Sequence, residues 1–483
     1  MGKVDSPFDE EEYNAFVEGL EVSIINKSDL ERTLRFDSEF YSEENLVIQD
    51  ILNKHKTAKI SDLTYVSDGN HMSISDRFAE KGIPYYRGQD IHNFFIEQSN
   101  PICIDEEAYN LPTMKRSHLK KGDVLLSIVG TIGGVSLVSK EEPATCNCKL
   151  AILRPNHIDG FYLSVFLQSK FGQNQIKKFT RGAVQKGLIL EDMDQIFVPV
   201  LSIDFQNEIH SLLDLAYKKL ERSKKIYKHS EDVILDIIGL NSSELNKDSL
   251  NIKNLKESFL ESGRLDAEYY QPKYDDYLQL IYNYSNGYKP LYEVCNIKDK
   301  NFKLVDKKQY NYIELSDIGK SGEVKSCTTD FGSELPTRAR RKVSTNDVII
   351  SSIEGSLESC ALISSEYDNA LCSTGFYVIN SEIINAETLL VLFKSELMQN
   401  ILKQNCSGTI LTSISKNEFI NIPVPIIDEK TQEKIQSKIT ESFQLRTESE
   451  ELLEAAKQAV ELAIEQGETA ATDFINNNYG DKF

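Results

Sequence analysis

Short loops that carry glycine beside polar or basic residues occur in two kinds, and each kind is found twice in the chain. One kind follows a predicted buried strand, at 130–134 and 354–356, and the other follows a predicted helix, at 180–186 and 406–409. Glycine lets a backbone approach a bulky ligand closely. Arg, Lys, Gln, Ser and Thr are the side chains that read base edges or hold phosphates. We therefore predict that these loops contact nucleic acid.

The candidate contact residues are the basic, amide and hydroxyl side chains of these loops and of neighbouring turns. In the first half they are Arg87, Gln89, Lys115, Arg116, Thr131, Arg181, Gln185 and Lys186. In the second half they are Arg338, Arg340, Arg341, Ser407 and Thr409. The run 338–342 is the densest basic cluster of the chain, and a solvated loop is its alternative explanation. Each glycine loop, taken singly, is more often a plain turn.

Sequence signatures of catalysis are missing. There is no phosphate-cradling glycine loop, no His-Glu-x-x-His and no Gly-x-Ser-x-Gly elbow. The seven histidines are dispersed, and among the eight cysteines only Cys146 and Cys148 lie close together. One Cys-x-Cys without a second pair is weak evidence for zinc, so we expect reduced thiols and neither a metal nor a cofactor. We expect a non-catalytic protein.

One set of charged residues suggests a competing enzyme hypothesis. Asp317 followed by Glu323-Val324-Lys325 loosely resembles a nuclease cluster, in which carboxylates hold Mg²⁺ and a lysine polarises water. The first half has no equivalent of this cluster. A charged β-turn explains these residues better.

The candidate loops belong to a duplicated framework. Arg35-Phe36-Asp37-Ser38-Glu39-Phe40-Tyr41 recurs as Arg264-Leu265-Asp266-Ala267-Glu268-Tyr269-Tyr270. Further landmarks follow both copies in the same order, roughly 225 to 230 residues apart, including Gly122-Asp123-Val124 against Asn346-Asp347-Val348. This period is far longer than that of solenoid repeats, which indicates two related domains.

Hydrophobic patterns predict the elements that position the loops. Short apolar runs broken by turn residues predict a mostly β core in each half, with one helix near 160–178 and near 386–403. Long stretches without proline, about 205–238 and 431–470, carry apolar stripes at helical spacing. The fold class expected is α+β: two tandem mostly-β domains, each followed by a long helix, with the two helices paired as an antiparallel coiled coil. That coiled coil would hold the two cores apart at a fixed distance. Packing of each helix on its own core is the alternative.

The net charge of −21 argues at first against a partner rich in phosphate. However, the acidity lies mainly in 1–59 and 426–483, whereas 60–200 and 285–425 are nearly neutral. Locally basic faces on both cores are therefore compatible with the composition. The chain has no apolar run long enough to span a membrane and no secretory signal, so we expect it in the cytoplasm.

The order of these landmarks resembles that of the specificity subunit of type I restriction-modification systems. The similarity rests on Ile60-Ser61-Asp62-Leu63, on Lys121 to Ser127 followed by Gly130-Thr131, on Arg181-Gly182, and on the Arg264 to Tyr270 entry. The exits Val198-Pro199-Val200 and Ile422-Pro423-Val424-Pro425, each leading into a Gln-x-x-Ile, also match. The second copy departs from this pattern in having Asn346 in place of the glycine.

The resemblance implies a protein that is not itself an enzyme. It implies two target-recognition domains that read the two parts of a split double-stranded DNA sequence through the major groove. It also implies recruitment of adenine-specific DNA methyltransferase subunits, usually two, and through them of restriction/translocase subunits. A specificity subunit of another methylation-based phage-defence system would look similar. A coiled-coil adaptor that does not bind DNA is the alternative of a different class.

With this resemblance the expected boundaries can be stated. The predicted segments are an acidic leader and framework segment at 1–44, target-recognition domain 1 at 45–200, a central long helix at 201–245, a linker and repeat entry at 246–283, target-recognition domain 2 at 284–427, a C-terminal long helix at 428–470 and a polar tail at 471–483.

Overall fold

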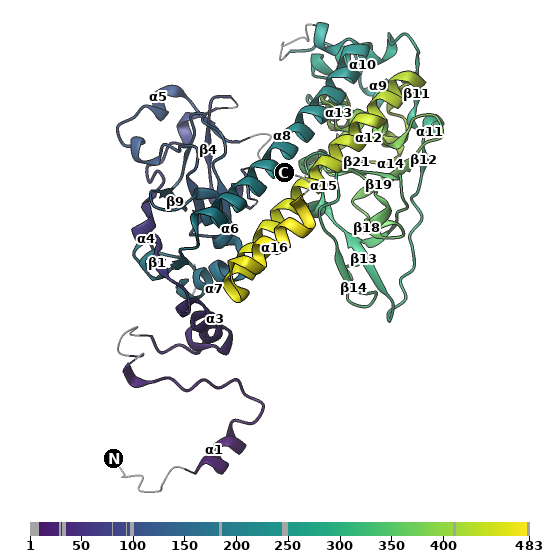
Figure 1. Ribbon diagram of the computed structural model, residues 1–483. Coiled ribbons are helices and arrows are strands. Elements are labelled where there is room, and N and C mark those ends of the chain that lie inside the picture. Colours follow the sequence, from purple (N-terminus) through teal and green to yellow (C-terminus); the bar gives the residue numbers. More distant parts are fainter. Residues whose placement is uncertain are drawn as a thin grey trace, which may run out of the picture. The chain divides into compact units, whose positions relative to one another are not determined.

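The computed structural model (Figure 1) describes residues 9–28, 30, 35–79, 81–92, 94–96, 101–182, 186–243, 250–408 and 412–480. Its contacts divide the chain into two compact units. Unit 1 is Met1–Lys218 together with Glu448–Phe483, and unit 2 is Lys219–Thr447. The division differs from the expected linear boundaries because each long helix contributes one half to each unit. Among the described residues, no helix has the length and apolar character needed to cross a membrane.

Unit 1 contains two four-stranded sheets and a closing strand pair. Strand β6 is buried along its whole length, as its apolar sequence predicts. The first sheet has the order β2 (Thr64–Asp68), β9 (Leu150–Pro155), β6 (Val124–Ser127), β7 (Val135–Leu137). The second has the order β3 (Phe78–Ala79), β5 (Cys103–Ile104), β4 (Ile83–Tyr86), β8 (Thr145–Cys146). Strands β1 (Thr57–Lys59) and β10 (Phe197–Pro199) pair antiparallel at the entry and exit.

Unit 2 repeats the strand order of the first sheet, whereas its second sheet places the parallel strand pair in the centre and not at the edge. One sheet has the order β12 (Asn296–Ile297), β19 (Phe376–Asn380), β16 (Val348–Ser351), β17 (Cys360–Leu362). The other has the order β14 (Thr328–Phe331), β13 (Gln309–Ile313), β18 (Leu371–Ser373), β15 (Ala339–Lys342), and β11 (Tyr288–Pro290) pairs with β22 (Pro423–Pro425). The parallel pair β4–β8 of unit 1 has its counterpart in the parallel pair β13–β18. The duplication predicted from the sequence is thus visible in the strand pairing.

The helical segment of each core is a pair of helices, so the prediction of one helix in each was wrong. Unit 1 has α6 (Gly160–Gln168) and α7 (Lys170–Phe179), and unit 2 has α12 (Ala386–Lys394) and α13 (Glu396–Gln404). The break falls at Ser169 and Ser395, whose backbones are extended and whose hydroxyls donate to Phe166 O and Leu392 O at 2.6 Å. Each serine also caps the next helix, which a helix-interior position could not do.

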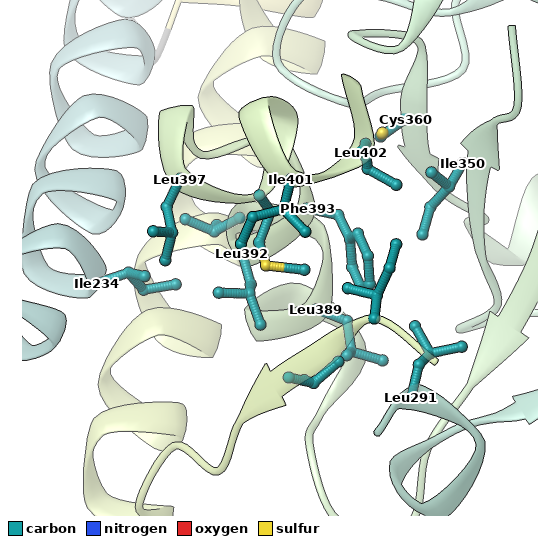
Figure 2. Packing of buried hydrophobic residues seen from close by; sticks show 14 of the residues in the cluster. Ile234, Leu291, Ile350, Cys360, Leu389, Leu392, Phe393, Leu397, Ile401 and Leu402 are labelled. Atoms are coloured by element: carbon teal, nitrogen blue, oxygen red, sulfur yellow. The ribbon is translucent and has the colours of Figure 1, made fainter. Parts of the chain in front are cut away.

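The core of unit 2 forms where this helix pair covers a sheet (Figure 2). Leu389 and Phe393 of α12 and Ile401 of α13 are fully buried together with Ile350 of β16. Ile234 of the long helix belongs to the same cluster. Burial of such side chains stabilises the fold by about 1.5 to 3 kcal/mol each. The loops at the strand ends therefore stand on a rigid support.

The long helices α8 (Ile203–Ile238) and α15 (Glu429–Gln466) pair antiparallel. In unit 2 the Ser442 hydroxyl donates to Ser223 O at 2.9 Å, and in unit 1 the Ser449 hydroxyl donates to Ala216 O at 2.8 Å. From Ala216 to Ser223 the residue number rises by seven on α8, and from Ser449 to Ser442 it falls by seven on α15. The helices therefore run antiparallel, and their contacts repeat every seven residues, the heptad spacing of a coiled coil. Small residues recur at this spacing, namely Ala216, Ser223 and Ser230 on α8 and Ser442, Ser449, Ala456 and Ala463 on α15, and all are buried. The predicted antiparallel pairing is confirmed.

Two expected segments differ from the prediction. The stretch 471–483, expected to be a polar tail, is helical through Tyr479 as part of α16 (Glu468–Tyr479). Ala471 and Ile475 are buried there, and the Thr472 hydroxyl donates to Glu208 of α8 at 2.8 Å. The expected linker 246–283 contains α9 (Phe259–Ser262) and α10 (Pro272–Tyr282), and α10 buries Tyr274 and Tyr277 in the core of unit 2. Entry to the second repeat is therefore part of that domain.

At the N-terminal end of the chain, the described part of the segment 1–44 has little regular structure. It contains α1 (Glu10–Phe16) and the 3₁₀ helix η1 (Ser38–Tyr41), and α3 (Glu43–Asn53) begins within it. Phe40 of η1 is buried and its ring meets that of Phe179 edge-on, with centroids 5.6 Å apart. The repeated Arg-x-Asp segment is thereby attached to the end of α7.

Candidate nucleic-acid interface

The strand ends of unit 1 meet at one edge of its two sheets. Strands β4 and β8 run parallel, so their last residues Tyr86 and Cys146 lie opposite each other. Strand β9 begins at Leu150, opposite the end of β6, and pairs its next residue with Asp68 at the end of β2. The loop residues next to these strand ends form a surface that we call the first loop edge. It consists of 69–70, 87–90, 129–134, 147–149, 181–182 and 186–187. Both predicted glycine loops of the first half lie there.

Backbone hydrogen bonds tie these loops to one another. The Asn147 amide donates to Tyr86 O at 3.0 Å, and the Cys148 amide donates to Asn70 O at 2.9 Å. The Leu188 amide donates to Ile128 O at 2.9 Å, while Arg181 and Gly187 exchange two bonds of 2.8 Å. Loops that are distant in sequence are thus held as one surface, which suits a rigid recognition site.

Three arginines at the first loop edge or beside it are held by carboxylates; Arg116 lies beside it and donates to Gly69 O at 3.2 Å. Arg87 donates to Asp90 from Nε at 3.1 Å and from Nη2 at 3.3 Å. The Nη2 groups of Arg116 and Arg181 donate to Asp68 and Asp192 in the same way. Each arginine remains at least 31% exposed, whereas the acids are 13% exposed or less. Buried acids therefore orient cations that face solvent.

The Asp192 carboxyl lies under the loop that carries Arg181. Burial raises the pKa of Asp192, although the guanidinium groups of Arg181 and Arg35 act in the opposite direction. Desolvation disfavours the charged form of an acid, and here this effect is larger than the attraction of the two cations.

Of the other candidates of the first half, Gln89, Thr131 and Lys186 lie at the same edge, and Lys115 lies outside it, next to Arg116. Gln89, Lys115 and Lys186 are exposed, and the Thr131 hydroxyl donates to Gly88 O at 3.0 Å, which joins the two loops. Gln185 lies outside the described residues. A hollow of about 660 Å³ opens between the loops and the Arg-x-Asp segment. Its lining is Arg35, Asp37, Glu39, Gly130, Ile132, Lys177, Thr180, Arg181, Gly182 and Lys186.

Unit 2 builds a corresponding second loop edge, which we define as 314–316, 338, 352–356, 374–375, 407–408 and 412–413. The Thr374 amide donates to Arg338 O and the Ser352 amide donates to Gly375 O, both at 2.9 Å. The Glu354 amide donates to Thr412 O at 3.0 Å. The loop at 354–356 is therefore joined to the residues that pair with Ser407 of the other predicted loop.

The arginines of the basic run 338–342 lie in different surroundings, because strand β15 begins at Ala339. Arg338 is exposed at the second loop edge, whereas Arg340 falls in a β-bulge and its Nε donates to Thr337 O at 2.8 Å. Arg341 pairs opposite Cys372 and its Nη1 donates to the Asn301 side chain at 3.0 Å. Ser407 is exposed on β20 (Cys406–Ser407), and Thr409 lies outside the described residues. Of the three arginines, the structure brings Arg338 to the edge.

The acid of the repeated turn before the central strand has a structural role. The Asp123 carboxylate is buried and accepts from Arg154 at 2.8 and 2.7 Å, and Asp347 accepts from Lys298 at 2.7 Å and Asn380 at 2.9 Å. The residue before each acid has positive φ, +89° at Gly122 and +67° at Asn346. Asparagine tolerates this conformation better than most residues, so the departure from the family pattern keeps the turn.

The nuclease hypothesis has no support in the described part of the chain. Glu323 Oε1 lies 3.3 Å from Arg446 Nη1, and its side chain is 14% exposed. No group of three metal-ligating side chains occurs among the described residues. Glu323 is an ion-pair partner of a buried arginine.

Sequence reasoning missed two lysines of unit 1. Lys149 and Lys177 are exposed, the first on the 147–149 connection and the second in the hollow that Arg35 also lines. The sequence did hold a signal for Lys149: Cys146 recurs as Cys372 in the second half, and it marks the strand end that this lysine follows. Lys177 had no signal, since its position depends on the break at Ser169.

Comparison with known proteins shows what the part of the chain that carries this surface is similar to. The sequence model of the type I restriction modification DNA specificity domain matches residues 53–229. These residues are similar to that domain. The resemblance to type I specificity subunits is thereby confirmed, and the matched range contains every described residue of the first loop edge.

Individual relatives are more distant. The specificity subunit of the *Escherichia coli* type I restriction enzyme EcoBI is 25% identical over 160 residues, which is 32% of this chain and 30% of that protein. The match therefore spans less than a third of the relative's length. A type I S subunit from *M. genitalium* is 16% identical, with 85% of this chain and 95% of that chain covered and a TM-score of 0.39. HsdS from Thermoanaerobacter tengcongensis is 13% identical, with 85% of this chain and 97% of that chain covered and a TM-score of 0.29.

Proposed function

We propose that this chain is the DNA-specificity subunit of a type I restriction-modification complex, and that each loop edge reads one part of a bipartite double-stranded DNA sequence. The observation that carries the proposal is the duplication of the edge. Both units bring the loop after the central strand and the loop after the helix pair to the same strand ends. The family of residues 53–229 supports the same function. The subunit is non-catalytic in this proposal.

The paired arginines suit sequence readout. An arginine held by a carboxylate keeps one orientation before DNA arrives, so less side-chain entropy is lost on binding. Arg181 has the exposed guanidinium that a bidentate contact with guanine requires. Exposed Lys115, Lys149 and Lys186 can neutralise phosphates and set the register on the duplex.

The proposed partners follow from the family. Adenine-specific DNA methyltransferase subunits, two for each chain, bind this subunit, and restriction/translocase subunits join through them. The exposed faces of α8 and α15 offer a docking surface of regular geometry. The chain then works in the cytoplasm, where DNA and these subunits are found.

Methylation mapping tests the proposal. DNA is sequenced for modified adenine from cells that express this chain with the methyltransferase encoded beside it, and from cells that express the methyltransferase alone. We expect a new bipartite methylated sequence only when this chain is present. Unchanged methylation in cells where the complex is shown to be intact would contradict the proposal and favour an adaptor that does not bind DNA.

A further inference from the structure

The repeated Arg-x-Asp segment folds into the same local arrangement in both units. In unit 1 Arg35 donates to Asp37 at 2.6 and 2.9 Å, and its guanidinium lies 4.8 Å from the ring centroid of Phe40. In unit 2 Arg264 donates to Asp266 at 2.8 and 2.6 Å and lies 4.4 Å from the Tyr269 centroid. A bidentate carboxylate and an aromatic face together fix the plane of a guanidinium.

In unit 2 the fixed guanidinium reaches the start of a reading loop. Arg264 Nη2 donates to Cys406 O at 2.8 Å and Nη1 donates to Gln404 O at 3.4 Å. These carbonyls end α13 and begin the loop that continues through Ser407. Arg264 is only 14% exposed. It therefore binds the backbone at the point where the loop leaves the helix pair, in the manner of a helix C-cap.

An acid faces this guanidinium in both units. Glu418 Oε1 lies 3.8 Å from Arg264 Nη1, and it precedes the first residue of β22 by five positions. Asp192 precedes the first residue of β10 by the same number, and its charge interacts with both Arg35 and Arg181. Arg35 also lines the hollow together with Thr180, Arg181 and Gly182, where the loop of unit 1 begins. The segment thus meets equivalent parts of the two units.

We propose that Arg35 and Arg264 are positioning residues, each of which fixes the origin of one reading loop and so sets the recognition of one half-site. The proposal rests on the proposed function, because it takes the two edges to read two half-sites. In this proposal neither the Arg35 nor the Arg264 guanidinium contacts DNA. Loss of either one lets the loop after α7 or α13 change its starting position, and base contacts made by that loop lose their geometry.

The test uses the complete complex with its methyltransferase subunits and duplexes that carry mismatches in one half-site at a time. Arg35→Ala and Arg264→Ala are compared with wild type, and Arg222→Ala is the matched control. Arg222 is an exposed arginine of α8 that forms an ion pair with Glu441 of α15. We expect discrimination to fall about tenfold at one half-site in Arg264→Ala and at the other half-site in Arg35→Ala. The control should retain both.

Arg264→Lys separates positioning from folding. Lysine keeps the charge but cannot bind Asp266 and two carbonyls with one planar group, so we expect the same half-site to lose discrimination at an unchanged melting temperature. Equal loss at both half-sites, or no loss in either alanine variant, would overturn the proposal. A wild-type complex that recognises no bipartite sequence would instead refute the proposed function itself.

Discussion

Unit 1 attaches its β core to the long helices with an aromatic contact, whereas unit 2 uses a buried ion pair at the equivalent place. The Leu137 amide of β7 donates to Phe94 O at 2.7 Å, and the Leu362 amide of β17 donates to Gly322 O at 2.9 Å. The next residues, Phe95 and Glu323, therefore correspond. Phe95 packs on Tyr217 of α8 with ring centroids 5.1 Å apart, and Glu323 pairs with Arg446 of α15.

This difference shows which features are shared by the two repeats and which have diverged. The strand order of the sheet that contains the central strand, the turn before that strand and the Arg-x-Asp segment are the same in both units. The chemistry of the anchor has changed completely while its position next to the equivalent strand has not. A buried ion pair stabilises only while both partners are present, whereas an aromatic contact depends on shape and area. The two anchors should therefore respond differently to mutation.

The largest effect is expected from breaking the ion pair. Arg446→Ala leaves Glu323 without its cation in a site of low exposure and should destabilise unit 2 by about 4 kcal/mol. Hydrogen–deuterium exchange resolves the loss to unit 2. The double variant Glu323→Leu/Arg446→Met removes both charges and should cost much less than the single change. Equal costs for the single and double variants would show that the pair is not the anchor.

The aromatic anchor should lose somewhat less. Phe95→Ala removes a side chain that is 2% exposed and should cost unit 1 about 3 kcal/mol. Because no charge is involved, the loss should be the same at low and high salt in a denaturant titration. A loss that changes with salt, or that appears in unit 2, would end the proposed contrast between the anchors.

The turn before the central strand provides a smaller and symmetrical test. Gly122→Asn should cost only a few tenths of a kcal/mol, because Asn346 already occupies the same positive φ in unit 2. Gly122→Ala and Asn346→Ala should each cost about 1 kcal/mol through the backbone alone, since no atom lies within 4 Å of an added Cβ at Gly122. Thermal melting measures all three. A costly Gly122→Asn would mean that the two turns are not equivalent.

The smallest effect is the pH dependence of the shared segment. Hydrogen bonds from Arg35 and Arg264 lower the pKa of Asp37 and Asp266. A carboxyl with a lowered pKa in the folded state contributes stability that is fully present above its unfolded pKa of about 3.9 and is lost as the pH falls through the folded value. Asp266→Asn should remove less than about 1 kcal/mol, and only above that range. Melting curves of wild type and variant should therefore converge at acidic pH.

Much of this architecture could be predicted from the sequence because it follows from local patterns of apolar residues. Apolar runs such as Val124 to Leu126 predict buried strands, and the stripes on 205–238 and 431–470 predict the paired helices. Repetition then predicts two domains. The breaks at Ser169 and Ser395 could not be predicted, because a serine within an apolar helical pattern signals a cap only once the next helix is known to turn away.

The loops of the candidate interface could be predicted from the sequence, but the placement of their side chains could not. The position of Arg338 at the edge, and of Arg341 along the strand, depends on the bulge in β15 and on the pairing with β18. From the sequence, Glu323 is expected to be an exposed surface residue. Its partner Arg446 is more than a hundred residues away in the chain. Tertiary contacts of this kind leave no local pattern.

Selection of DNA by the purified complex tests the central claim most directly. Randomised duplexes are selected with wild type, with Arg181→Ala in unit 1 and with Arg338→Ala in unit 2. We predict one bipartite sequence for wild type, relaxed at one half by Arg181→Ala and at the other half by Arg338→Ala. If both variants relaxed the same bases, or if both weakened binding without changing any base preference, the assignment of one half-site to each unit would be wrong.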